Sequence, residues 1–207
     1  PAAGESRRES MPPGPPAEWS ARLALLAIGA TLLVMTARHW PAEIHAEQAR
    51  QALRDGDYGR AVAAARSAIE RDPTNPEPYH HLGEARLYSA AKIKSRALAG
   101  ALYADAARNL QLGLERFPQD VWGQINLGQA LDGAGRHDEA LAAYREARRL
   151  DPHSAQPYEY LGLHYERIGE IGKAREHYRI ALDIGWTGAQ FARQNLRAIE
   201  QRLQQAD

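Results

Sequence analysis

Residues 121–154 read VWGQINLGQALDGAGRHDEALAAYREARRLDPHS, and this stretch decides the fold of the chain. Its two halves are predicted to form antiparallel helices joined by a turn at Gly135. Gly128 and Ala140 are small, so the two helix backbones can approach closely. Pro152 ends the second helix, because proline cannot continue a helix and biases the residue before it towards an extended conformation.

The same pattern recurs along the chain with a period of 34 residues. Aspartate-proline pairs at Asp72-Pro73 and Asp151-Pro152 mark the ends of two units. Counting from them divides the chain into four copies: 42–75, 76–120, 121–154 and 155–188. A self-similar unit of about 34 residues is typical of a helix-turn-helix solenoid, which usually holds partners and does not make or break bonds.

The repeated positions resemble the signature of the tetratricopeptide repeat family. In the third copy the matching residues are Leu127-Gly128, Leu131, Gly135, Ala140, Tyr144, Ala147 and Pro152. In the fourth copy they are Tyr158, Leu161-Gly162, Tyr165, Gly169, Ala174, Tyr178 and Ala181, with Gly185-Trp186 in place of the closing aspartate-proline. The resemblance implies an all-α solenoid of about four helical hairpins, covering residues 42–186, that mediates protein–protein interaction.

The two earlier copies depart from the pattern. The first copy keeps its second half but has Gln48-Ala49 where leucine-glycine is expected. The second copy, 76–120, has Leu82-Gly83 at its start and Tyr103, Ala106 and Pro118 towards its end, and it is 11 residues longer than the others. Eleven residues make about three helical turns, which favours longer helices with a displaced turn across 88–100. A flexible insert is the alternative.

The end of the chain, residues 189–207, is predicted to be a capping helix. Ala192, Leu196, Ile199 and Leu203 recur at helical spacing among polar residues, which gives one apolar face. A solenoid needs a terminal helix whose outer side is polar, and this stretch supplies it.

Composition agrees with an all-α globular protein, since 44% of the residues are hydrophobic and no alternating strand pattern occurs. The absence of cysteine excludes disulfides, thiolate catalysis and cysteine-based zinc sites. The charge is balanced, with 26 basic and 26 acidic residues, which argues against a protein that coats nucleic acid.

The amino-terminal region is predicted to hold a disordered tail, 1–18, and a single transmembrane helix, 19–40. The tail is rich in proline, glycine and charge. Residues 23–37 carry no charge, but they span only about 22 Å as a helix, so the flanks decide the interpretation. Trp19 and Trp40 suit the two membrane interfaces, while Arg22 and Arg38 can extend outwards. A cleaved signal peptide and a buried soluble helix are the alternatives.

Basic residues on the two sides of this span are equal in number, so they do not set its orientation. By analogy with common bacterial single-span proteins, we expect the inner membrane with the repeats in the periplasm. Small residues at Ser20, Ala24, Ala27 and Thr31 share one helical face, which permits close packing against a partner helix. Such residues are also simply common in membrane helices.

By resemblance to the family, the partner-binding surface is the concave groove formed by the first helix of each hairpin. The predicted groove residues are Glu77, His80, Glu84, Trp122, Ile125, Gln129, Gln156, Glu159 and Leu163. Trp122 and Ile125 would form an apolar centre rimmed by carboxylates, which suits an amphipathic helix or an extended segment with basic flanks. Packing between repeats is the alternative role for Trp122. Asn126 alone matches the carboxylate-gripping set of some family members, which argues against that mode of binding.

Candidate catalytic and metal-binding residues are weak in this sequence. His80 and His81 are adjacent, so on a helix they point about 100° apart. His164 and His177 belong to no histidine–carboxylate cluster at metal-binding spacing. We therefore predict no enzyme activity, metal or cofactor. The sequence predicts a membrane-anchored scaffold or adaptor for assembly of an envelope complex, with a permanent structural subunit of a membrane complex as the alternative.

Overall fold

The computed structural model describes residues 17–185 and 190–204, without the side chains of 17–19 and 35–40. Most of the predicted tail, 1–16, lies outside the described residues. The chain divides into two units, Pro1–Trp40 and Pro41–Asp207, and each is described by itself.

The described residues form nine helices and no strand, in agreement with the all-α prediction. The helices are α1 (Ala17–Arg54), α2 (Tyr58–Arg71), α3 (Glu77–Lys92), α4 (Arg96–Arg116), α5 (Val121–Gly133), α6 (His137–Leu150), α7 (Gln156–Arg167), α8 (Ile171–Ile184) and α9 (Gln190–Gln204). Helix α1 contains Pro41, where the two units meet.

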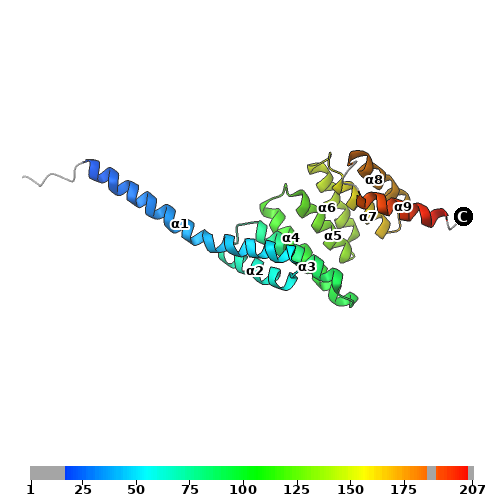
Figure 1. The fold of residues 1–207 in the computed structure, drawn as a ribbon, viewed down its shortest axis with the longest axis horizontal. Coiled ribbons are helices and arrows are strands. Elements are labelled where there is room, and N and C mark those ends of the chain that lie inside the picture. The colour runs from blue at the N-terminus through cyan, green and yellow to red at the C-terminus, as the bar shows by residue number, and fades with distance from the viewer. Residues whose placement is uncertain (1–16, 186–189, 205–207) are drawn as a thin grey trace, which may run out of the picture. The chain divides into compact units, whose positions relative to one another are not determined.

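The second unit is a stack of helical hairpins (Figure 1). Helices α3 and α4, α5 and α6, and α7 and α8 pack as pairs, and each pair packs on the next. The first helices of the hairpins also touch in sequence, because α3 contacts α5, α5 contacts α7 and α7 contacts α9. One face of the stack is therefore made of first helices, as in a helical-hairpin solenoid.

Small residues allow the two helices of each hairpin to pack closely. The alanines at the same position of the four second helices, Ala61, Ala106, Ala140 and Ala174, have no exposed surface. A Cβ on Gly128 would lie 2.5 Å from the Tyr144 ring, and a Cβ on Gly162 would lie 2.5 Å from the Tyr178 ring. Each tyrosine thus packs directly on the backbone of the first helix, which any larger residue at the glycine would prevent.

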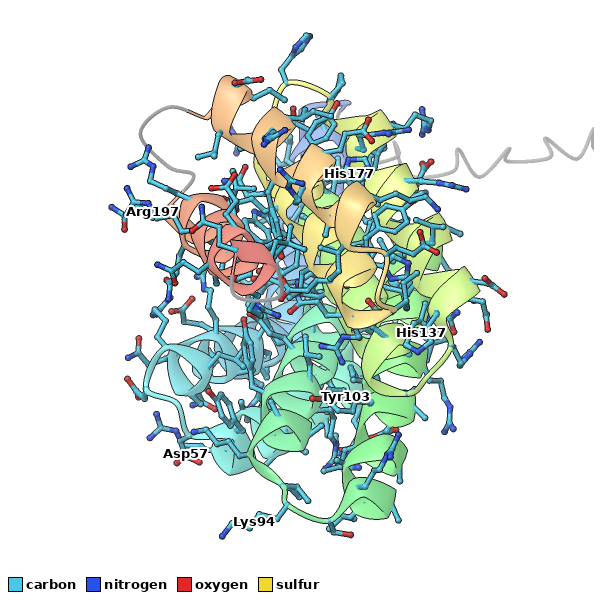
Figure 2. The ribbon with its side chains drawn as sticks, turned by 90° about the vertical axis from the view of Figure 1, so that its right-hand side faces the viewer. Asp57, Lys94, Tyr103, His137, His177 and Arg197 are labelled. Atoms are coloured by element: carbon cyan, nitrogen blue, oxygen red, sulfur yellow. The ribbon has the colours of Figure 1, made fainter. Side chains whose placement is uncertain are left out.

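The extra residues of the second repeat lengthen its two helices. Helix α3 has 16 residues and α4 has 21, against 12 to 14 in α5, α6, α7 and α8. The turn between them also differs. Gly56, Gly135 and Gly169 have positive φ in the other hairpins, whereas here Ser95 caps α4 by accepting a hydrogen bond from the Leu98 amide. Lys94 lies at the tip of this hairpin (Figure 2).

In the second repeat a leucine packs on the glycine of the first helix. Leu110 faces Gly83, because a Cβ on Gly83 would lie 2.5 Å from the Leu110 side chain. Tyr103 packs instead on Gly133 at the end of α5, 2.5 Å from the Cβ that a larger residue would add there. Leu110 is the equivalent of Tyr144 once the 11 extra residues are counted, and Tyr103 lies about two helical turns before it.

Helix α9 packs on the last hairpin through Ala192 and Ile199, which are buried. Leu203, which we expected on the same apolar face, is 41% exposed. The backbone amide of Ala192 donates a hydrogen bond to the Glu159 carboxylate at 3.3 Å. Glu159 therefore satisfies one of the unpaired amides in the first turn of α9.

In the first unit, apolar side chains of α1 are exposed. Leu23, Leu25, Leu26, Ile28, Leu32, Leu33 and Val34 are each 57–73% exposed. Among the described residues, no helix combines the length and the hydrophobicity needed to cross a membrane. The transmembrane helix predicted at 19–40 is thus not found there, and the side chains of Trp19, Arg38 and Trp40 lie outside the described residues.

Candidate protein-binding groove

A cleft of about 620 Å³ lies along the first helices of the hairpins. It is lined by Arg50, Leu53, Arg54, His80, His81, Glu84, Tyr88, Trp122, Asn126 and Tyr160. These residues come from α1, α3, α5 and α7, which are the first helices of four successive hairpins. The cleft therefore lies on the surface that the resemblance to the repeat family predicts.

Trp122 is the most prominent apolar group of the cleft. It lies in the first turn of α5 and is 50% exposed. Its ring meets Tyr160 edge to face, with 6.4 Å between the ring centroids. Trp122 also lines a neighbouring hollow of about 320 Å³. The ring thus packs partly between repeats and keeps half of its surface free for a partner.

A chain of polar groups lies beside Trp122. The Gln129 amide donates to the Asn126 side-chain oxygen at 3.1 Å, and the Asn126 amide nitrogen lies 3.3 Å from His80 Nε2. His80 Nδ1 in turn lies 2.9 Å from Asp120, the residue before α5. These groups can exchange hydrogen bonds with the backbone or side chains of a bound segment.

The pair of His80 and Asp120 shifts both titrations towards the charged forms. Burial lowers the pKa of His80, but the hydrogen bond and charge of Asp120 more than offset it, so the pKa is raised. Burial raises the pKa of Asp120. The hydrogen bonds from His80 and from the amides of Gly123 and Trp122 lower it by more, so the pKa of Asp120 falls below its ordinary value. The site therefore favours a paired charge under the tryptophan.

Two other groups in the cleft are held neutral. Burial lowers the pKa of His81 to about 4, and no residue described here forms a hydrogen bond with its Nδ1. Burial, followed by the charge of Glu84, raises the pKa of Tyr88 to about 12. His81 and Tyr88 are thus uncharged near neutral pH.

Charges of both signs lie at the edges of the cleft. Arg50 and Arg54 each form an ion pair with Glu47, and all three side chains are about half exposed. Glu84 lies half-buried on α3. The rim is therefore mixed in charge, and not only acidic as the sequence suggested.

Some predicted groove residues lie in the cleft, and others do not. His80, Glu84 and Trp122 line it. Gln129 does not line it but donates a hydrogen bond to Asn126, which does. Ile125 is completely buried and belongs to the packing between helices, so its prediction as a surface residue is wrong. Glu159 is 7% exposed and is covered by α9. Glu77 and Gln156 are exposed and Leu163 is half-buried, but none of them lines the cleft.

Sequence reasoning missed Leu53, Tyr88 and Tyr160 as lining residues. Tyr88 lies in the extra turns of α3, so no equivalent position in the other repeats points to it. Tyr160 lies two residues before Gly162, between two predicted groove positions. An aromatic residue at that spacing was an available signal.

The structure also overturns the statement that His164 belongs to no histidine–carboxylate cluster. His164 Nδ1 lies 3.0 Å from Asp132, and His137 Nδ1 lies 2.8 Å from the same oxygen. His164 lies 32 residues from Asp132 in the sequence, so spacing alone did not reveal the cluster. His177 is a different case, since it stacks on Tyr165 with ring centroids 5.2 Å apart.

Stacked helical hairpins with an open cleft along their first helices define a helical-repeat protein. Comparison with known proteins identifies the family: residues 95–155 and 125–189 match the tetratricopeptide repeat. The chain belongs to the tetratricopeptide repeat family. Such folds bind protein or peptide partners, and the family's members are typically non-enzymatic scaffolds.

Curated relatives are much longer than this chain. It is 33% identical over 162 residues to tetratricopeptide repeat protein 28 of Mus musculus, covering 75% of this chain and 6% of that protein. It is 30% identical over 168 residues to the protein CTR9 homolog of Arabidopsis thaliana, covering 77% of this chain and 14% of that protein. The similarity therefore concerns the repeats and not the relatives' other parts.

Solved structures agree on the fold. A tetratricopeptide repeat protein of Thermus thermophilus, TTC0263, has a TM-score of 0.68 and 20% identity, with 86% of this chain and 94% of that chain covered. PilF of Pseudomonas aeruginosa has a TM-score of 0.62 and 19% identity, with 80% and 72% covered. At these identities the likeness shows the fold alone.

Proposed function

We propose that this chain is a non-enzymatic adaptor that binds a segment of another protein in the cleft along its first helices. The single observation that supports this most is Trp122, which stays half exposed beside Tyr160 in the middle of the cleft. Exposed aromatic residues in concave surfaces are the usual anchors of protein recognition.

The lining of the cleft defines the bound segment. Trp122, Tyr88 and Tyr160 offer an apolar floor for a large aliphatic or aromatic side chain. Arg50 and Arg54 can accept an acidic group at one end, and Glu84 can accept a basic group nearer the centre. An amphipathic helix or an extended segment that carries both charges fits this arrangement.

Mass spectrometry of proteins that co-purify under gentle conditions tests the proposal. Partner binding should survive in a form that starts at Ala42, and Trp122→Ala should weaken it about tenfold or more, because the variant removes the central anchor. Leu98→Ala is the matched control, since Leu98 is 51% exposed at the start of α4 and does not line the cleft. Equal binding by the two variants would exclude the cleft as the docking site.

Attachment to a bacterial inner membrane through residues 19–40, with the repeats in the periplasm, is the second part of the proposal. The exposed apolar side chains of α1 between Leu23 and Val34 support it, because such a surface needs a cover of lipid or protein. Alkaline carbonate extraction is the test. Release of the intact protein into the soluble fraction would contradict membrane insertion.

A permanent structural subunit is the alternative function. The exposed small residues Ser20, Ala24, Ala27 and Thr31 favour it, because they allow a partner helix to approach closely. The Thr31 hydroxyl donates to the Ala27 carbonyl at 2.7 Å, so it needs no partner of its own. In this case removal of residues 1–40 would abolish complex formation, whereas an adaptor would still bind its client.

A further inference from the structure

A second cluster of polar side chains lies at the joint between the third and fourth repeats. Asp132 is near the end of α5, His137 begins α6 and His164 lies on α7. His137 is labelled in Figure 2 at the start of its helix. Its Nδ1 is 2.8 Å from Asp132 Oδ1, and His164 Nδ1 is 3.0 Å from the same oxygen. The three donor atoms all lie within 4.8 Å of one another.

The cluster has a buried floor and one accessible side. The side chains of Asp132 and His164 are 2% and 1% exposed, whereas that of His137 is 41% exposed. A small ion can therefore reach the donor atoms past His137. Once bound, it would be shielded from bulk water by the two hairpins.

We propose that Asp132, His137 and His164 bind a divalent transition-metal ion, for which Zn²⁺ is the best match. Two imidazole nitrogens and one carboxylate oxygen are a common donor set for zinc, and three protein ligands leave the fourth position open. Bonds of about 2.0–2.1 Å place tetrahedral donor atoms about 3.3 Å apart. The observed distances of 2.8 and 3.0 Å need to widen by only a few tenths of an ångström.

The protonation states of the two histidines allow an ion to replace their hydrogen bonds to Asp132. In the absence of an ion, both histidines can donate from Nδ1 to the Asp132 carboxylate. A neutral imidazole that binds an ion through Nδ1 carries its single proton on Nε2 instead, so binding requires no charged intermediate. The Tyr144 hydroxyl donates to Asp132 Oδ2 at 3.3 Å and would keep the carboxylate oriented.

The ion would link two repeats. Asp132 and His137 belong to the α5/α6 hairpin, and His164 belongs to the first helix of the next hairpin. Zn²⁺ would thus restrain the angle between the third and fourth repeats. This role is independent of the cleft at Trp122, since none of the three residues lines it.

Titration with Zn²⁺ alone tests the site. Isothermal titration calorimetry of the full chain should give one ion per chain, and Zn²⁺ at a hundredfold excess over its Kd should raise Tm by roughly 5 °C or more. His137→Ala should weaken the affinity at least tenfold and remove the shift in Tm. Co²⁺ in place of Zn²⁺ should give the visible absorption of a four-coordinate ion.

His153→Ala is the matched control, because His153 is an exposed histidine outside the cluster. It should leave the affinity and the shift in Tm unchanged. His137→Ala removes an accessible side chain and should fold normally, which circular dichroism checks. Absence of binding to the parent chain, or equal affinity in the parent and His137→Ala, would overturn the proposal.

Discussion

Asp132 and Glu166 occupy the same position in consecutive repeats, yet their carboxylates have different partners. Each carboxylate accepts a hydrogen bond from the tyrosine of its own second helix, Tyr144 or Tyr178, at 3.3 Å. Asp132 then meets His164 and His137, whereas Glu166 forms an ion pair of 2.8 Å with Arg202 of α9.

The element that covers each carboxylate explains the difference. A complete repeat covers Asp132, which is 2% exposed, so its partner His164 is buried as well. The amphipathic cap covers Glu166, which stays 19% exposed, and its partner Arg202 is 62% exposed. One position in the repeat therefore carries a buried polar network inside the array and a solvated ion pair at its end.

Asp132→Ala should have the largest effect. It leaves the buried Nδ1 of His164 without its partner and opens a cavity, so unfolding free energy should fall by about 3 kcal/mol. Glu166→Ala should cost less than about 1 kcal/mol, because Arg202 can turn to water. Urea denaturation at pH 7.5 measures both. Equal losses would break the distinction between the two joints.

His81 sharpens the comparison, because it is a buried histidine without a hydrogen-bonded carboxylate. The Glu77 carboxylate stays 3.7 Å from its Nε2, and burial lowers the pKa of His81 to about 4. An unfolded chain has a histidine pKa of about 6.5, so it binds more protons than the folded chain between these values. The stability that His81 contributes is therefore complete above pH 6.5 and is lost as the pH falls towards 4.

Acidification from pH 7.5 to pH 5 should cost the parent about 2 kcal/mol through His81. His81→Leu removes the titrating group, so its stability should decrease by that much less over the same interval. Urea denaturation at the two pH values gives the difference for each chain. The same decrease in both chains would show that His81 is already accessible to protons in the folded state.

Gly128 and Gly162 test how the two tyrosines are held. Alanine at either position would lie 2.5 Å from the Tyr144 or Tyr178 ring, so each ring must shift away from its carboxylate. We expect a loss of about 1 kcal/mol at each position, since overpacking exceeds the gain in helix propensity. Gly100→Ala is the control, because nothing lies within 4 Å of an added Cβ, and it should stabilise the chain slightly. Chemical denaturation measures the free energy of unfolding, which should fall in the variants at Gly128 and Gly162 and rise slightly in Gly100→Ala.

The hairpins could be predicted from the sequence, but the contacts between repeats could not. The period of 34 residues, the turn glycines and the small residues between paired helices are local patterns, so the hairpins could be predicted. The contact of each glycine with the tyrosine of its own second helix was found only in the structure. Trp122 was found because groove positions repeat with the same period. Ile125 was misplaced because an apolar residue at a groove position can turn inwards, and the contact of Asp132 with His164 depends on packing between repeats, which spacing does not show.

Arg202→Ala should have the smallest effect on stability. It distinguishes the contribution of the ion pair with Glu166 from the contribution of the packing of α9 over that carboxylate. Arg202 and Glu166 lie 2.8 Å apart, but the arginine is 62% exposed, so the pair should contribute at most about 1 kcal/mol. High salt should remove most of that contribution. Arg197→Ala, at another exposed position of α9 (Figure 2), controls for helix propensity. A larger, salt-independent loss for Arg202→Ala alone would mean that Glu166 is desolvated like Asp132, and the end of the array would then resemble its interior.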